Sequence, residues 1–160
     1  MAKWNAALGI ALLPLGLGAC VSGATKIVAP AAAVRPHVQS VTVVAGAHDV
    51  GVDLGEVRQF EDSLRTRLYA PGAFTQGPDM TIQYRFLSYQ GGRQVRGYVL
   101  GVEAAQGKTD GMEIEVRYLA PNGAELARIE VDGATRLGPF KQAVEKAATQ
   151  AADYAVVQFK

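Results

Sequence analysis

Cysteine is almost missing from this sequence, which contains Cys20 and no other among its 160 residues. A single cysteine has no partner for an intramolecular disulfide and no second thiolate for a zinc site. Histidine is also scarce, and His37 and His48 stand in segments with no helix-spaced carboxylate. The sequence therefore predicts no zinc or iron site, no other cofactor, and a fold that gains nothing from disulfides.

An excess of positive charge is missing too. The chain has 16 basic and 15 acidic side chains, and without residues 1–19, which contain Lys3 and no acid, the balance is 15 to 15. Nucleic-acid binding needs a basic surface, so we expect no nucleic-acid partner. A phosphate-binding loop is also absent, because the glycine that should precede Gly107-Lys108-Thr109 falls one residue off, on Val102, and an alternating strand follows instead of a helix. We expect no nucleotide.

The N-terminal apolar run, residues 6–15, is too short to span a bilayer, which takes about 20 residues. It follows the basic residue Lys3 and ends at Leu17-Gly18-Ala19-Cys20. This order is typical of an export signal, and its last four residues resemble the lipobox of bacterial lipoprotein precursors. That class implies removal of residues 1–19 and attachment of diacylglycerol to the thiol of Cys20.

Other interpretations of Cys20 remain: an inert buried thiol, a redox or metal-binding cysteine, a plain signal peptide, or a retained anchor. Lipidation explains its place at the end of the apolar run, and two or three acyl chains anchor a protein far more firmly than one. The residue after Cys20 is Val21 and not an aspartate. In lipoproteins of bacteria with two membranes, this implies transport to the outer membrane, where the protein faces the periplasm.

Three regions follow from this interpretation: a signal peptide at 1–19, a flexible tether at 20–39 and a single domain at 40–160. The tether is predicted from Gly23, Pro30, three successive alanines and Pro36, with no helical or strand period. A random coil of about 19 residues has a root-mean-square reach of about 25 Å, enough for the domain to stand off the bilayer.

The domain begins with a β-branched strand at 40–44, and a capping box, Asp53-Leu54-Gly55-Glu56, predicts the start of a helix. Apolar residues at spacings of three and four predict a helix face that packs on a sheet, and Ala70-Pro71-Gly72 ends the helix. The members of this face are Val57, Phe60, Leu64 and Leu68.

Strict alternation then predicts strands at 79–89, 112–118 and 127–131, the last two joined by a tight turn at Pro121-Asn122-Gly123. Residues 98–102 are interpreted as one further hairpin arm. Gly138-Pro139 opens a last helix whose alanine-rich face packs on the sheet rather than on a membrane or a partner. The expected fold is α+β, an antiparallel sheet of about four to five strands with two helices on one face, in the order β-α-β-β-β-β-α.

Few side chains in the domain indicate chemistry. His48-Asp49 is the one place where a base and a carboxylate adjoin, but a nucleophilic site needs a third group, and a solvated turn explains the pair more simply. Glu113 and Glu115 share a strand face that we expect to be solvated. Arg93 and Arg96 stand between glycines and either contact an anionic group or keep an exposed turn soluble.

The stretch Asp79-Met80-Thr81-Ile82-Gln83-Tyr84, followed by Gly91-Gly92-Arg93-Gln94-Val95-Arg96-Gly97, resembles a bacterial lipoprotein family called domain of unknown function 4410. The likeness covers about 40–159, with the Gly-x-Arg-x-x-Arg stretch as its specific part. It implies an envelope lipoprotein with two helices on a sheet and no assigned activity, and it supplies no catalytic residue.

We therefore expect a lipid-anchored, non-enzymatic binding module of the cell envelope, held in the membrane through Cys20 and paired with another envelope protein. The alternative is an accessory lipoprotein subunit of an envelope transport or secretion complex. A third class, a hydrolase that uses His48, has only the His48-Asp49 pair to support it.

Overall fold

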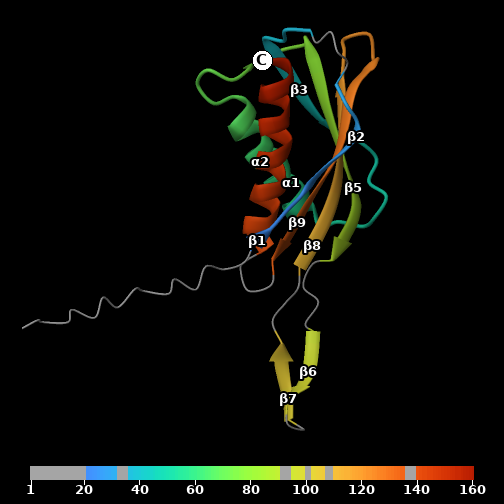
Figure 1. The fold of residues 1–160 in the computed structure, drawn as a ribbon, viewed down its shortest axis with the longest axis vertical. Helices are drawn as coiled ribbons and strands as arrows, with labels where there is room; N and C mark the ends of the chain where they lie inside the picture. Colours follow the sequence, from blue (N-terminus) through green and yellow to red (C-terminus); the bar gives the residue numbers. More distant parts are fainter. Residues whose placement is uncertain (1–20, 32–35, 91–94, 100–101, 107–109, 136–139) are drawn as a thin grey trace, which may run out of the picture.

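The computed structural model describes residues 21–31, 36–90, 95–99, 102–106, 110–135 and 140–160. These form two helices and nine strands, seven of them in one main sheet and two, β6 and β7, in a separate two-stranded sheet (Figure 1). In chain order the elements are β1 (Val21–Ser22), β2 (Thr25–Ala29), β3 (Ser40–Ala45), α1 (Leu54–Leu68), β4 (Thr75–Gln76), β5 (Met80–Gln90), β6 (Val95–Val99), β7 (Val102–Gln106), β8 (Asp110–Leu119), β9 (Glu125–Thr135) and α2 (Phe140–Phe159).

The main sheet has seven strands in the order β1-β9-β8-β5-β3-β4, with β2 also paired to β9. The α+β class is confirmed, but the expected antiparallel sheet of four to five strands is wrong: β3 runs parallel to both β4 and β5. The chain leaves β3, crosses through the 15-residue helix α1 and returns alongside it, and a crossover helix is how parallel neighbours are joined.

The first described residues belong to the sheet. β1 and β2 pair antiparallel with β9, from Val21 opposite Thr135 to Ala29 opposite Arg128. The expectation that the predicted tether contains no strand is therefore wrong for 21–22 and 25–29. The residues of β2 are mostly exposed, so this strand lacks the apolar alternation by which a strand is recognised in a sequence.

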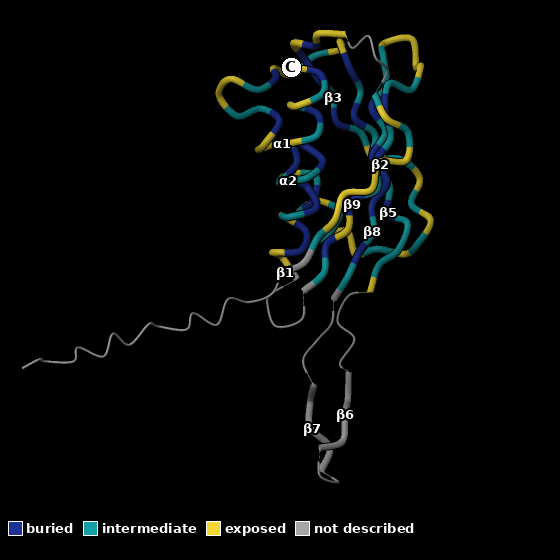
Figure 2. The backbone as a smooth tube through the Cα atoms, viewed as in Figure 1, coloured by how far each residue is buried: buried dark blue, intermediate teal, exposed yellow. Residues whose placement is uncertain are grey.

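Both helices cover the same face of the sheet, as Figure 1 shows, and the buried residues line the space between the two layers in Figure 2. The predicted helix face is confirmed, with Phe60, Leu64 and Leu68 fully buried. The alanine face of α2 is buried as expected, which lets this helix approach the sheet closely. The sheet contributes mainly Ile82, Tyr84, Phe86, Ile114, Val116, Tyr118, Ile129 and Val131 to the core.

Two buried tyrosines fasten the helices to the sheet. The Tyr84 hydroxyl donates to Glu61 Oε2 on α1 at 2.8 Å, and the Tyr118 hydroxyl donates to the carbonyl of Ala151 on α2 at 2.8 Å. Burial, and for Tyr84 also the bond to Glu61, raises the pKa of both phenols. Each tyrosine thus places its ring in the core while its hydroxyl finds a partner.

The turns follow the sequence prediction. Asp53 caps α1 by accepting a hydrogen bond from the N–H of Gly55 at 2.7 Å, and Gly72 adopts a left-handed φ of 84° after the helix. Gly123 does the same between β8 and β9, at 82°. The arm expected at 98–102 is wrong, because this stretch contains the end of β6 and the start of β7, two strands paired with each other.

The outer edge of β3 is partly covered. Its pairing with β4 involves Ser40 and Val41, and the Val41 carbonyl accepts hydrogen bonds from the N–H of Gly77 at 3.2 Å and from the hydroxyl of Tyr69 at 3.0 Å. Beyond this pairing, the carbonyl of Val43 accepts a hydrogen bond from Arg65 Nη2 of α1 at 3.1 Å, which occupies a backbone group that could otherwise pair with another strand. The opposite edge, at β2, is shielded by Lys26 and a bulge after Ile27.

Candidate functional site

The face of the sheet turned away from the helices is polar, and no described helix covers it (Figure 1). Its side chains alternate along β5, β8 and β9 with those of the core, as the period of two requires. At its centre lies a group of six charged residues that we call the sheet-face cluster: Asp49, Arg85, Glu115, Arg117, Glu125 and Arg128.

Glu115 is the innermost member of the sheet-face cluster. It is only 5% exposed, although it lies on the uncovered face. Arg85, its register partner on β5, donates through Nε to Glu115 Oε1 at 2.9 Å and through Nη1 to Asp49 at 3.1 Å. Arg128 Nη1 lies 3.9 Å from the other oxygen of Glu115. The hydrogen bond to Glu115 raises the pKa of the Arg85 guanidinium.

Glu125 separates two arginines that the register places opposite each other. Arg117 and Arg128 are cross-strand partners, an arrangement that is repulsive by itself. Arg117 Nε donates to one oxygen of Glu125 at 2.8 Å, and Arg128 donates to the other at 2.9 and 3.0 Å. Burial acts to raise the pKa of Glu125, but the hydrogen bonds from Arg128 and Arg117 outweigh it and hold the pKa below its ordinary value.

A hollow of about 310 Å³ opens over this cluster. Its lining includes all three arginines of the cluster, together with Glu115, Gln83, Tyr84, Gly46 and Ala47. Within the cluster three arginines face three carboxylates, so the charges cancel. The site therefore offers fixed donors and acceptors of both signs, which suits a polar or mixed-charge surface better than a free anion.

The structure corrects one prediction about this face. Glu113 and Glu115 were both expected on a solvated side, and Glu113 is partly exposed, but Glu115 is buried between Arg85 and Arg128. The alternation of β8 places both glutamates on one face and cannot reveal which neighbouring strand supplies an arginine. Only the register with β5 and β9 gives that information.

The two residues of the candidate nucleophilic pair have separate partners. His48 Nδ1 accepts a hydrogen bond from the N–H of Phe86 at 3.4 Å, and its ring lies edge-on to the Phe86 ring. Asp49 binds Arg85 instead of His48. The loop at 46–49 runs along β5 through backbone hydrogen bonds to Tyr84 and Phe86, which accounts for both contacts. His37 is exposed.

Several predicted features lie outside the described residues. They are the signal peptide at 1–19, Cys20, Arg93, the segment Gly107-Lys108-Thr109 and the Gly138-Pro139 pair. Arg96 lies in β6 opposite Ala105. Within the described ranges no helix could span a bilayer, and no group of three or more His, Cys, Asp and Glu side chains is placed to hold a metal ion.

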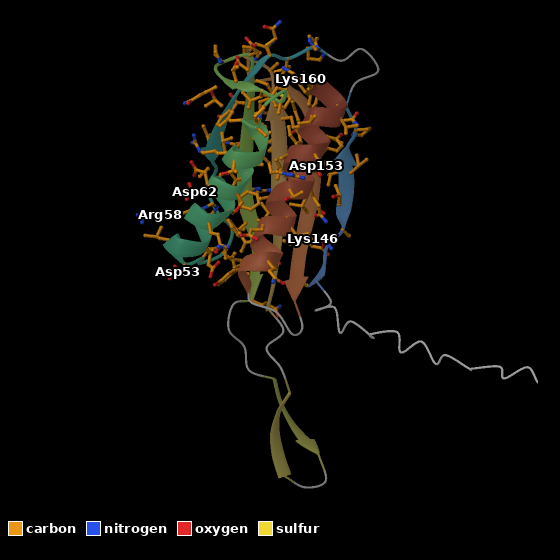
Figure 3. All side chains as sticks on the ribbon, turned by 90° about the vertical axis from the view of Figure 1, so that its left-hand side faces the viewer. Asp53, Arg58, Asp62, Lys146, Asp153 and Lys160 are labelled. Carbon is orange, nitrogen blue, oxygen red and sulfur yellow. The ribbon has the colours of Figure 1, made fainter. Side chains whose placement is uncertain are left out.

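A wider hollow of about 710 Å³ lies on the outer surface of the helix pair, and Figure 3 looks onto it. Its lining includes Arg58 and Asp62 of α1 and Lys141 and Glu145 of α2. The side chains of Lys141 and Glu145 are 68% and 48% exposed, so their ion pair is held in water. Such solvated pairs contribute little binding energy, which makes the sheet-face cluster the better candidate site.

Comparison with known proteins finds structures of similar fold but assigns the chain to no family. No family model and no curated protein matches the chain. The PelC dodecamer from Paraburkholderia phytofirmans is similar in structure at a TM-score of 0.55 and 11% identity, and a single-substitution variant of it at 0.52 and 11%. Both matches cover 87% of this chain and 99% of that one. A minor lipoprotein from Acinetobacter baumannii matches more weakly, at a TM-score of 0.37 and 12% identity over 75% of this chain and 91% of that one. At these identities the likeness to PelC shows the fold alone.

Proposed function

We propose that this chain is a lipid-anchored, non-enzymatic module of the bacterial cell envelope that binds another envelope component through the open face of its sheet. The proposed binding site is the sheet-face cluster. The observation that supports it is that the buried carboxylate of Glu115 and three arginines line a hollow on a surface that no described helix covers. The anchor is supported by Leu17-Gly18-Ala19-Cys20 at the end of the apolar N-terminal run.

The cluster is suited to binding because its side chains are already ordered. Arg85 and Arg128 each contact two carboxylates, and Glu125 accepts from two arginines. Long side chains held in this way lose little further freedom when a partner docks, so less of the interaction energy is spent on ordering them. Carboxylates on a charged partner can form ion pairs with the exposed parts of the three arginine side chains.

The resemblance to the family called domain of unknown function 4410 agrees with an envelope lipoprotein of this kind. Within that proposal, Val21 after the acylated cysteine places the protein at the outer membrane, facing the periplasm, in a host with two membranes. The intact mass of the membrane-extracted protein tests the anchor. We expect loss of residues 1–19 and a diacylglycerol adduct, and no fatty-acid labelling of a Cys20→Ser control. Unmodified protein in the cytosol that retains residues 1–19 would contradict the proposal.

Partner capture tests the binding face. The lipoprotein is cross-linked in cells, extracted in mild detergent and analysed with its neighbours, as wild type, as Arg117→Ala and as Arg58→Ala. Arg117 lines the hollow, whereas Arg58 makes the same chemical change on the outer side of α1. We expect the partner to be lost only with Arg117→Ala. Equal recovery with both variants would show that the open face is not the binding surface.

A second candidate is an accessory subunit of an envelope transport or secretion complex. The protein of similar fold is a dodecamer, so the same extract is also analysed by mass to detect self-assembly. Reproducible recovery of an inner-membrane permease would favour this candidate over the first.

A further inference from the structure

The charges on the open face of the main sheet are segregated along its strands. On β8, Arg117 lies four residues from Glu113, and on β9, Arg128 lies four residues from Asp132. The register pairs Arg117 with Arg128 and Glu113 with Asp132, so like charges lie opposite each other at both places. The face therefore has an arginine end and an acidic end, about 13 Å apart along the strands.

The acidic end of this face keeps charges that no ion pair uses. Within the described residues, no basic side chain forms an ion pair with Glu113 or Asp132, and the nearby Lys26 binds Glu130 at 2.6 Å. Asp132 is exposed and Glu113 is partly exposed, and both line a hollow of about 240 Å³. Basic groups of a partner can therefore reach both acids.

The arginine end is likewise open to a partner. Glu125 is shared between Arg117 and Arg128, so one carboxylate serves two guanidinium groups. The side chains of Arg117 and Arg128 are 39% and 34% exposed, and both line the hollow of about 310 Å³ over the sheet-face cluster. Carboxylates of a partner can therefore reach both arginines.

We propose that the open face binds the same face of a second copy of this chain, with the arginine end of each copy on the acidic end of the other. This inference rests on the proposed function, because it takes the open face as the binding surface, and it names the occupant. A half-turn about an axis between the two sheets, running across the strands at Glu115, exchanges the two ends. It places Arg117 opposite Glu113 of the second copy and Arg128 opposite Asp132 of the second copy, each pair formed twice by symmetry.

The acids nearest to this axis face copies of themselves, and their charges are already paired within each copy. Glu115 accepts a hydrogen bond from Arg85 at 2.9 Å, and Glu130 accepts one from Lys26 at 2.6 Å. Each carboxylate therefore meets its copy with a cation beside it and not as a bare charge. The face as a whole offers both signs of charge, and the same face turned by a half-turn offers them in the reverse order.

The open face is also large enough for a stable dimer. It spans five adjacent strands, β2, β9, β8, β5 and β3, of which β8 has 10 residues. At about 4.8 Å per strand and about 3.4 Å per residue, this surface measures about 24 Å by about 34 Å, or about 800 Å² on each copy. An interface of standard size buries about 800 Å² on each partner. The charge pattern and the area therefore both fit a second copy.

Charge reversal in two tagged copies tests this pairing. Full-length lipoproteins with two different C-terminal tags are produced in the same cells and extracted in mild detergent. One tag is captured and the other is measured. Arg117→Glu and Glu113→Arg are each placed first in both copies, and then one in each copy. The control is Arg58→Glu in both copies, which makes the same change of charge on the outer side of α1.

We expect wild-type copies to capture each other, and each reversed variant to capture itself at least about tenfold less, because like charges then meet at both symmetric contacts. A copy with Arg117→Glu should capture a copy with Glu113→Arg as well as wild type captures wild type, since both contacts again join opposite charges. Arg58→Glu should capture itself normally. Recovery in the mixed pair also shows that both reversed variants are folded.

Wild-type copies that do not capture each other would overturn the inference. Reversed variants that still capture themselves would also overturn it, because the copies would then meet through another surface. So would a mixed pair that stays apart, since the arginine end would then not lie on the acidic end. The proposed function is judged separately, by recovery of a different envelope protein. Loss of that protein with Arg117→Ala, without capture between tagged copies, would leave the proposed function standing and remove this inference.

Discussion

The two faces of the main sheet are built from the same strands and follow opposite rules. On the covered face, Ile114 and Val116 of β8 are fully buried against the helices. On the open face, between these two, Glu115 is almost as deeply buried, but beneath arginine side chains instead of a helix. At Glu115 the two faces therefore do not differ in burial, and they differ in which groups provide it.

The comparison shows two ways of shielding a strand. Apolar packing is non-directional and needs a second layer, which α1 and α2 provide. The open face has no second layer of helices, and there the guanidinium groups of Arg85 and Arg128 lie against Glu115 while the arginine side chains remain partly exposed to water. Such a cover can be moved aside or shared with a partner, whereas the helix layer cannot be removed without unfolding the core.

The largest effect is expected where the helix layer approaches the sheet most closely. A Cβ added at Gly133 of β9 would overlap the carbonyl group of Ala143 on α2, whose carbon lies 2.9 Å away. Gly133→Ala should lower the free energy of unfolding by about 1–3 kcal/mol, measured by chemical denaturation, since backbone cannot give way as a side chain does. The control, Gly111→Ala on β8, meets only the Gly133 carbonyl, at an ordinary 3.8 Å, and should be neutral or slightly stabilising. Equal losses in both variants would show that α2 is not held this tightly.

An intermediate effect should come from the open face. Glu115→Gln removes the charge that receives the hydrogen bond from Arg85, and we expect a loss of about 1–2 kcal/mol in the free energy of unfolding. The loss should stay below that of a fully buried pair, because the Arg85 side chain is 39% exposed and can be hydrated. Glu113→Gln, the same change two residues away, should stay within about 0.5 kcal/mol. If the two variants lose the same stability, the burial of Glu115 has no energetic consequence.

The smallest effect is a pH dependence at Glu125. Its pKa is lower in the folded protein than the ordinary value of 4.5, so the folded state favours the ionised form. The resulting stability is fully present above 4.5 and is lost as the pH falls through the lowered folded-state value. Glu125→Gln should remove this part of the acid sensitivity, by less than about 1 kcal/mol because the pairs are partly solvated. Denaturation of both proteins at pH 7 and in stepwise acid measures the difference, and parallel curves would contradict the assignment.

Much of the fold could be predicted because its signals are local. The spacing of Phe60, Leu64 and Leu68 fixes a helix face, and Asn122-Gly123 fixes a turn, whatever the rest of the chain does. The edge strands β1 and β2 could not be found in this way, because only their pairing with β9 makes them strands. The parallel direction of β3 also escaped prediction, since parallel and antiparallel strands can show the same alternation.

The sequence by itself determined the elements of the core, the near balance of acidic and basic side chains, and the position of the single cysteine after an apolar run. These depend on composition and on periods of a few residues. Only the tertiary structure decided that Glu115 is buried among arginines from two other strands and that residues 21–22 and 25–29 pair with β9 at the edge of the sheet. Both depend on sheet register, which joins residues far apart in the chain and leaves no mark in local sequence.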